Sequence, residues 1–273
     1  MTLPDRIAPT SPVLLFDSGV GGLTVLAEVR RLLPDAPIVY VADNAGLPYG
    51  TKSEAQVAAR VCGLLGRITE RLQPRLVCIA CNTASTIALG MVRDVLEIPI
   101  VGTVPAIKPA ASLTRTGVIG LLGTEATIRQ DYVDRLQAEF ARDKILLRHG
   151  APRLVEAAEA KLRGDAPGLD AVREAIDALR TMPGGTAMDT LVLACTHFPL
   201  LADELQTELG PEVRLVHGAQ GIARQVARLL DGQVFERVRP DTALFTGASP
   251  QIASLVPCLA RYGLSTMEVF TRR

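Results

Sequence analysis

The sequence contains no tryptophan, few other aromatic residues and no excess of charge of either sign. Aromatic residues make up 4% of the 273 residues, and 29 Lys and Arg residues balance 29 Asp and Glu residues. The chain therefore lacks the basic patches and the sets of aromatic rings by which proteins bind nucleic acids. It also lacks an apolar run long enough to cross a membrane. We expect neither a nucleic acid nor a membrane among its partners.

Cysteine is scarce as well. The five cysteines are an odd and sparse set, which argues against a disulfide scaffold and favours reduced thiols in the cytoplasm. The first apolar run, residues 12–16, is too short for the core of a signal peptide and follows Asp5 and Arg6. The cysteines are Cys62, Cys78, Cys81, Cys195 and Cys258.

The chain is rich in short, continuous apolar runs that alternate with segments of helical spacing. Hydrophobic residues make up 48% of the sequence. Such runs are typical of parallel strands covered by helices on both faces, and the length suits two domains. The sequence therefore predicts an α/β fold with two similar parallel-sheet domains. Among its helices we expect one from Glu125 to Phe140 and one that follows Cys195 and reaches Leu209.

Two of the apolar runs end in a cysteine. The first reads L-V-C-I-A-C-N-T-A-S over residues 76–85, and the second reads L-V-L-A-C-T-H-F-P-L over residues 191–200. Both cysteines, Cys81 and Cys195, stand where a strand ends and a helix begins, so the helix dipole and unpaired backbone N–H groups would stabilise a thiolate. Open parallel sheets bind ligands at this edge. We expect the first helix to be capped by Asn82, Thr83 and Ser85.

Two thiols on opposite sides of one substrate suit inversion at a carbon that bears an acidic proton. One thiolate removes the proton from one face, and the other thiol returns a proton to the opposite face. Both groups change protonation state in every turnover, which favours side chains with a pKa near the ambient pH, such as cysteine at about 8.5. No feature of the sequence demands pyridoxal phosphate or a metal, so the carbanion would be stabilised electrostatically.

The cysteines also have other interpretations. Each could be a small buried hydrophobic residue, as most unpaired cysteines are. Alternatively, Cys78 and Cys81 could bind zinc together with Cys195 and His197. Against zinc, residues three apart in a strand point to opposite faces of the sheet, and no glycine or proline forms a turn between Cys78 and Cys81.

The first strand is followed by the glycine-rich stretch D-S-G-V-G-G at residues 17–22. It lacks the spacing of a dinucleotide-binding motif and the Gly-Lys of a P-loop. A carboxylate at Asp17 would repel a phosphate, but it would bind a ligand's ammonium group, with the glycines letting the backbone come close. His197, two residues after Cys195, either makes ordinary hydrogen bonds at a helix start or supports the thiolate.

Four motifs together resemble those of the glutamate racemase family, cofactor-independent enzymes that supply D-glutamate for peptidoglycan. They cover nearly the whole chain in the family's order, and T-A-S after Cys81 and Asn82 favours glutamate over aspartate racemases. The motifs are F-D-S-G-V-G-G-L at 16–23, P-Y-G-T-K-S at 48–53, A-C-N-T-A-S at 80–85 and A-C-T-H-F-P-L-L at 194–201.

The resemblance implies a role for each motif residue. Cys81 and Cys195 would be the two acid/base catalysts, assisted by Asp17, His197 and Glu159. No cofactor and no metal are implied, the substrate would be glutamate, and the protein would form a homodimer. Thr124 resembles the partner of Thr127 in a threonine pair of the family. The substrate contacts would be Asp17, Ser18, Tyr49, Gly50, Asn82, Thr83, Thr127, Thr196 and His197.

The resemblance also implies the domain organisation. Residues 1–104 and 221–273 would form a first domain with Asp17 and Cys81, and residues 105–220 a second domain with Cys195 and His197, the active site lying in the cleft between them. A racemase of aspartate or of another acidic amino acid is an alternative, and a zinc- or ligand-binding protein without catalysis is another. The chain departs from the family pattern at Ala151, Glu156, Ala194 and residues 217–219.

Overall fold

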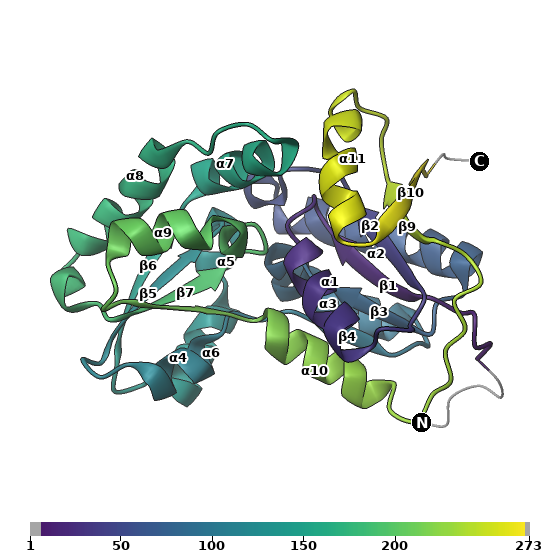
Figure 1. Cartoon of the computed structure of the whole chain (residues 1–273). Helices are drawn as coiled ribbons and strands as arrows, with labels where there is room; N and C mark the ends of the chain where they lie inside the picture. Colours follow the sequence, from purple (N-terminus) through teal and green to yellow (C-terminus); the bar gives the residue numbers. More distant parts are fainter. Residues whose placement is uncertain (1–6, 271–273) are drawn as a thin grey trace. The chain divides into compact units, whose positions relative to one another are not determined.

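The computed structural model describes residues 7–270, which form two α/β units (Figure 1). One unit contains the residues up to Thr103 and those from Ala219 onward, and the other is Val104–Gly218. Each unit is built on a sheet in which all neighbouring strands are parallel. The predicted fold class of two parallel-sheet α/β domains is confirmed.

The first unit has a sheet with the strand order β10-β9-β2-β1-β3-β4. Its strands are β1 (Val13–Asp17), β2 (Ile38–Ala42), β3 (Leu76–Ile79), β4 (Ile100–Gly102), β9 (Asp241–Phe245) and β10 (Leu264–Val269). Its helices are α1 (Leu23–Leu32), the short η1 (Tyr49–Thr51), α2 (Glu54–Leu72), α3 (Asn82–Val95), α10 (Ala219–Leu229) and α11 (Gln251–Arg261).

Helices cover both faces of this sheet. Apolar side chains of β1 and β3, among them Phe16 and Ile79, pack with α2 and α3 in one buried cluster, while α1 packs against α10. Helix α2 begins after Ser53, which forms a reciprocal capping box with Gln56. This cap fixes the point at which the loop after β2 enters the helix.

The second unit has a sheet with the strand order β6-β5-β7-β8, again covered on both faces. Its strands are β5 (Val118–Gly123), β6 (Ile145–Gly150), β7 (Thr190–Ala194) and β8 (Arg214–His217). Its helices are α4 (Ile107–Leu113), α5 (Glu125–Ile128), α6 (Asp131–Phe140), α7 (Pro152–Arg163), α8 (Leu169–Arg180), η2 (Gly185–Ala187), η3 (Phe198–Leu201) and α9 (Ala202–Leu209). Helices α7, α8 and α9 pack on one face, and α4 and α6 on the other.

Some predicted elements are wrong in detail. The single helix expected from Glu125 to Phe140 is two helices, α5 and α6, because the chain leaves α5 after one turn and starts α6 from Gln130. The segment after Cys195 begins as the 3-10 helix η3 before α9. The sequence interpretation also missed α4, which contains Pro109, and β10, an edge strand whose side chains are mostly exposed or half-buried.

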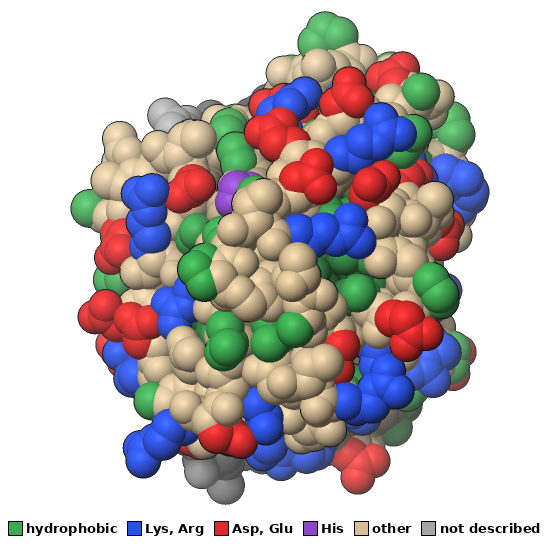
Figure 2. All heavy atoms as spheres, turned by 90° about the vertical axis from the view of Figure 1, so that its left-hand side faces the viewer, with side chains coloured by type: hydrophobic (Ala, Val, Ile, Leu, Met, Phe, Trp, Pro, Cys, Tyr) green, Lys and Arg blue, Asp and Glu red, His purple; other side chains and the backbone are tan. Residues whose placement is uncertain are grey.

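The surface agrees with the balanced composition. On the face shown in Figure 2, Lys and Arg side chains are interspersed with Asp and Glu, and hydrophobic side chains form only small groups. Between residues 7 and 270, none of the helices has the length and apolar character that a membrane crossing requires.

Candidate active site

Cys81 precedes helix α3 as its N-cap, at the carboxyl edge of the first unit's sheet. Its Sγ accepts a hydrogen bond from the Ala84 backbone N–H at 3.4 Å, and its thiol donates to Ser18 Oγ at 3.6 Å. The cysteine itself is therefore the helix cap. The expectation that Asn82, Thr83 and Ser85 would cap this helix is wrong. An N–H group directed at the sulfur at a helix start favours the thiolate.

Asp17, the last residue of β1, lies beside this thiol in the topology. Strand β1 pairs with β3, and Phe16 stands opposite Ile79 in the register. The Asp17 side chain is fully buried, and its Oδ2 accepts the Gly22 N–H at 2.8 Å. A Cβ on Gly22 would lie 2.9 Å from Tyr40 Oη and 3.1 Å from Asp17 Cβ, so this close approach needs a glycine. The glycine-rich loop thus holds a carboxylate at the strand tip.

Asn82 is the first residue of α3, directly after the thiol. Its side chain is 6% exposed, and within the part of the chain that the structure describes its Oδ1 is a buried oxygen without a hydrogen-bond partner. Such an oxygen is costly unless a donor reaches it. Asn82 therefore has the chemistry of an acceptor for a ligand's N–H group. Thr83 and Ser18 are also buried at this edge.

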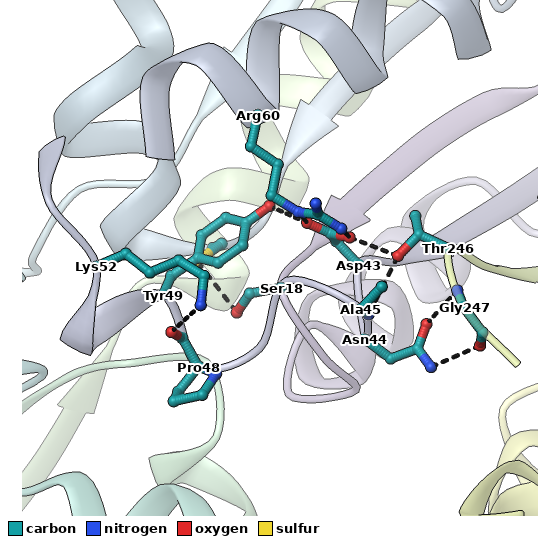
Figure 3. Close-up of polar contacts among 11 residues, drawn as sticks. Ser18, Asp43, Asn44, Ala45, Pro48, Tyr49, Lys52, Arg60, Thr246 and Gly247 are labelled. Carbon is teal, nitrogen blue, oxygen red and sulfur yellow. Dashed lines mark hydrogen bonds and ion pairs between the residues drawn. The ribbon is translucent and has the colours of Figure 1, made fainter. Parts of the chain in front are cut away.

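Tyr49 lies in η1, which contacts α3 and follows the loop after β2. The ring packs in the same cluster as Cys81, and the hydroxyl donates to the Asp43 carboxylate (Figure 3). Burial, together with the charge of Asp43, raises the pKa of Tyr49, so the phenol stays protonated. Since Asp43 takes the hydroxyl, this loop can offer a ligand the backbone of Tyr49 and of the half-buried Gly50.

Cys195 occupies the corresponding position in the second unit, directly after β7. Its Sγ is 3.8 Å from His197 Nδ1, and His197 Nε2 is 2.9 Å from Glu159 Oε1. Burial alone would lower the pKa of His197, but its hydrogen bonds to Cys195 and Glu159 and their charges raise it well above the ordinary value. The structure therefore brings Cys195, His197 and Glu159 into one chain of contacts.

The threonines of the second unit lie at the same edge of its sheet. Thr124 follows β5, and the last residue of β5, Gly123, pairs with Ala194 directly before Cys195. Thr124 Oγ1 is 3.0 Å from Thr127 Oγ1, and it accepts the Thr127 N–H at 3.1 Å. Thr127 is fully buried, and Thr196 is nearly so. Each unit therefore presents one thiol and several polar side chains at its carboxyl edge.

The zinc alternative can be compared with the geometry within each unit. Within residues 7–270, no group of three or more His, Cys, Asp or Glu side chains is arranged to hold a metal ion. Cys81 packs with Val77 and Ile79, whereas Cys78 is outside that cluster, as expected for residues on opposite faces of a sheet. Burial raises the pKa of the Cys78 thiol to about 12. Cys78 is a core residue.

The sequence interpretation missed Asp43, Arg60 and Thr246. Arg60 and Thr246 contact the Asp43 carboxylate, which also accepts the Tyr49 hydroxyl (Figure 3). One signal could have indicated Asp43. It follows the second buried strand directly, as Cys195 follows β7. The positions of Arg60 and Thr246 carry no such signal, because their partner is distant in the sequence.

Comparisons with known proteins agree on one family. Residues 24–226 match the family model described as Asp/Glu/Hydantoin racemase. The glutamate racemase of Sphingopyxis alaskensis is 58% identical over 262 residues, which span 96% of this chain and 98% of that protein. The crystal structure of Escherichia coli glutamate racemase with L-glutamate and the activator UDP-MurNAc-Ala has a TM-score of 0.88 and 42% identity, covering 96% of this chain and 98% of that one. Glutamate racemase isoform RacE1 of Bacillus anthracis has a TM-score of 0.80 and 28% identity, covering 97% and 98%.

Proposed function

The chain belongs to the Asp/Glu/Hydantoin racemase family, a family of isomerases, and we propose that it interconverts L- and D-glutamate. The observation that carries the proposal is the pair Cys81 and Cys195, each at the carboxyl edge of its own sheet with a contact that favours the thiolate. The similarity to the Escherichia coli enzyme, solved with L-glutamate, supports glutamate as the substrate.

The proposed reaction moves one proton off the α-carbon and one proton onto it. With L-glutamate, the Cys195 thiolate removes the α-proton and becomes a thiol, leaving a carbanion. The Cys81 thiol then donates its proton to the opposite face, which gives D-glutamate and a Cys81 thiolate. The enzyme is now in the state that accepts D-glutamate, so the reverse reaction starts from Cys81. This assignment of thiols to enantiomers follows the family resemblance.

The remaining site residues bind the substrate in this proposal. Asp17 and the Asn82 Oδ1 would accept hydrogen bonds from the α-ammonium group, which stays protonated and stabilises the carbanion electrostatically. His197 would hold the Cys195 thiolate, with Glu159 behind it. The other substrate contacts would come from Ser18, Tyr49, Gly50, Thr83, Thr127 and Thr196, with Thr124 positioning Thr127.

Two thiols supply both proton transfers, so the proposed reaction uses no pyridoxal phosphate and no metal. Chelator and hydroxylamine, a carbonyl reagent, should each leave the rate unchanged. We further propose a cytoplasmic homodimer whose D-glutamate enters peptidoglycan. Light scattering tests the dimer. Growth of a bacterial strain that requires D-glutamate, when it expresses this chain but not a Cys81→Ser variant, tests the role of the product.

The deciding experiment follows each amino acid separately by chiral chromatography. Purified protein incubated with L-glutamate or with D-glutamate should reach equal amounts of the two enantiomers, while L-aspartate stays unchanged. Faster conversion of aspartate would transfer the proposal to that substrate. No conversion of any of them, together with stoichiometric zinc that is lost in a Cys195→Ala variant, would favour a metal-binding protein.

A further inference from the structure

Three segments of the first unit meet at the carboxylate of Asp43, the residue directly after β2. Asp43 is fully buried, and it accepts hydrogen bonds from Tyr49 Oη, from Arg60 of α2 and from Thr246 Oγ1 after β9 (Figure 3). Arg60 binds it with two nitrogens, and the contact from Nη2 to Oδ1 is 2.6 Å. A bidentate pair of this kind fixes orientation as well as charge.

The neighbouring residues tie the same loop to the end of β9. Asn44 Nδ2 donates to the Gly247 carbonyl at 2.7 Å, and the Gly247 N–H donates back to Asn44 Oδ1 at 3.0 Å. The Ala45 N–H donates to Thr246 Oγ1 at 3.3 Å. A Cβ on Gly46 would collide with both the Arg60 guanidinium and the Asp43 carboxylate, so the ion pair fits only beneath a glycine. Hydrogen bonds to Thr246 and Gly247 therefore hold the loop after β2 at Asn44 and Ala45.

The contacts of Asp43 affect the surroundings of the Cys81 thiol through Tyr49. The tyrosine ring shares a buried cluster with Cys81, and η1 contacts the helix that Cys81 caps. The phenol donates to Asp43, so the position of the carboxylate sets the position of the ring and of the backbone at Gly50. The Asp43 N–H donates to the Asp17 carbonyl at 2.8 Å, and Arg60 compensates the charge of the buried Asp43 carboxylate.

We propose that Asp43 is a positioning residue for the half of the active site that contains Cys81. Together with Arg60 and Thr246 it holds Tyr49 by the hydroxyl, which places the backbone at Gly50 for the substrate and keeps the ring against the thiol. The kinetic part of this inference rests on the proposed racemase function. Asp43 itself acts only through Tyr49.

The opposite end of the same two strands provides a matched control. Asp241, the first residue of β9, accepts the Ile38 N–H at the start of β2 and pairs with Arg30 of α1. The side-chain exposures are 23% and 3% for Arg30 and Asp241, against 28% and 0% for Arg60 and Asp43. The two ion pairs are thus equally buried, but Arg30 and Asp241 lie at the amino ends of the strands, away from the thiol.

The experiment compares Arg60→Lys with Arg30→Lys. Lysine keeps the charge but loses the two-nitrogen contact of Arg60 with Asp43. At the control position it loses the guanidinium contacts of Arg30 with Asp241 and with the Pro34 and Ala36 carbonyls. Both variants should lower the unfolding temperature to a similar extent. Only Arg60→Lys should raise the KM for both glutamate enantiomers by about tenfold, with kcat within about threefold. The reason is that the variant weakens substrate binding at the Gly50 backbone and leaves both thiols in place. An unchanged KM in Arg60→Lys, or an equal rise in Arg30→Lys, would overturn the proposal.

A second readout needs no turnover. The rate at which iodoacetamide alkylates Cys81, resolved by peptide mass spectrometry, should rise in Arg60→Lys and in Tyr49→Phe but not in Arg30→Lys, because a loosened ring uncovers the sulfur. Tyr49→Phe removes only the hydroxyl and leaves the ion pair, so it tests the proposal even where Arg60→Lys does not fold. Equal alkylation in all variants would refute the positioning role. If the wild type fails to racemise glutamate, the proposed function fails, while this comparison still decides the role of Asp43.

Discussion

Cys81 and Cys195 occupy the same place in two similar sheets, yet their neighbours differ. Cys81 contacts the Ser18 hydroxyl and the Ala84 N–H, and Asp17 ends the neighbouring strand β1. Cys195 lies beside His197, whose imidazole is backed by the Glu159 carboxylate. Cys81 is the N-cap of α3, whereas the expected helix start at Cys195 is wrong, because Cys195 lies in a turn before η3, whose N-cap is His197. We expect the Cys195 side to depend more strongly on His197 than the Cys81 side does.

A thermodynamic constraint limits how this difference can be observed. L- and D-glutamate are mirror images with equal free energy, so the equilibrium constant is one and kcat/KM must be equal in the two directions for every variant. An asymmetry between the thiols therefore appears only in the separate kcat and KM values, in exchange of the α-proton, or in the pH dependence.

The largest effect should come from replacing either thiol. A Cys→Ser exchange keeps the shape but replaces a base of pKa about 8.5 with a hydroxyl that hardly ionises near neutrality. Racemisation should fall by about a hundredfold to ten-thousandfold in Cys81→Ser and in Cys195→Ser, the range expected for loss of a general base. The loss of racemisation is measured by chiral chromatography.

The same variants should separate the two thiols by substrate. In heavy water, Cys195→Ser should retain some α-proton exchange without inversion from D-glutamate, and Cys81→Ser should retain it from L-glutamate, because the remaining thiol can remove and return a proton on its own face. Proton NMR measures the exchange, and Cys62→Ser is the control that should behave as wild type. Substantial racemisation in either single variant would rule out the two-base mechanism.

Asp17→Asn should have the next largest effect, and it should be symmetric. Asparagine keeps the size of the side chain but loses the charge that would hold the substrate ammonium. Loss of a charge-assisted contact costs about 1.5–3 kcal/mol, so kcat/KM should fall at least about tenfold in both directions. Steady-state kinetics with each enantiomer test this, with the exposed Asp94→Asn as control. Near-normal kinetics would mean that the loop has another role.

His197→Asn should affect the Cys195 side and its pH dependence. The pKa of His197 is raised by the contacts with Cys195 and Glu159, against the effect of burial. Because this pKa is raised on folding, protonated His197 stabilises the folded protein in full at a pH below the pKa of an unfolded histidine. This stabilisation is lost as the pH rises through the pKa of His197 in the folded protein. Without the imidazolium, thiolate formation needs a higher pH, so the rising limb of the pH–kcat profile should move upward for L-glutamate.

The matching profile for D-glutamate provides the comparison. It should move less, because the imidazole of His197 contacts Cys195, the thiol that acts on L-glutamate in this proposal. Equal shifts for both enantiomers would show that His197 does not act specifically on one thiol.

Much of the fold could be predicted because short continuous apolar runs determine parallel strands. The capping box of Ser53 and Gln56 likewise specifies the start of α2 from local sequence alone. The break between α5 and α6 could not be predicted, because apolar spacing continues through it and no proline or glycine marks it. Edge strand β10 was missed for the opposite reason, since its side chains are too exposed to give a strong pattern.

The candidate site divides in the same way. Asp17 ends a buried strand, and Cys81 and Cys195 lie within two residues after one, a position that can be recognised in the sequence. The cap of α3 was assigned to Asn82, Thr83 and Ser85 because oxygen side chains usually fill that role, but here the sulfur takes it. The meeting of Asp43 with Thr246 joins residues 203 positions apart, and only the β2–β9 pairing brings them together.

Glu159→Gln should give the smallest effect, about threefold in kcat. Glutamine keeps an oxygen that can accept from His197 Nε2 and removes only the charge, in a site where the carboxylate is already shared with Arg163 at 3.7 Å. If Glu159 acts only through the imidazole, its effect must vanish once the imidazole is gone. A double-mutant cycle tests this. The variant with both Glu159→Gln and His197→Asn should then have the same kcat as His197→Asn alone. If the two substitutions lower kcat additively, Glu159 affects the reaction independently of the imidazole. Cys195 would then depend on His197 and on Glu159 separately.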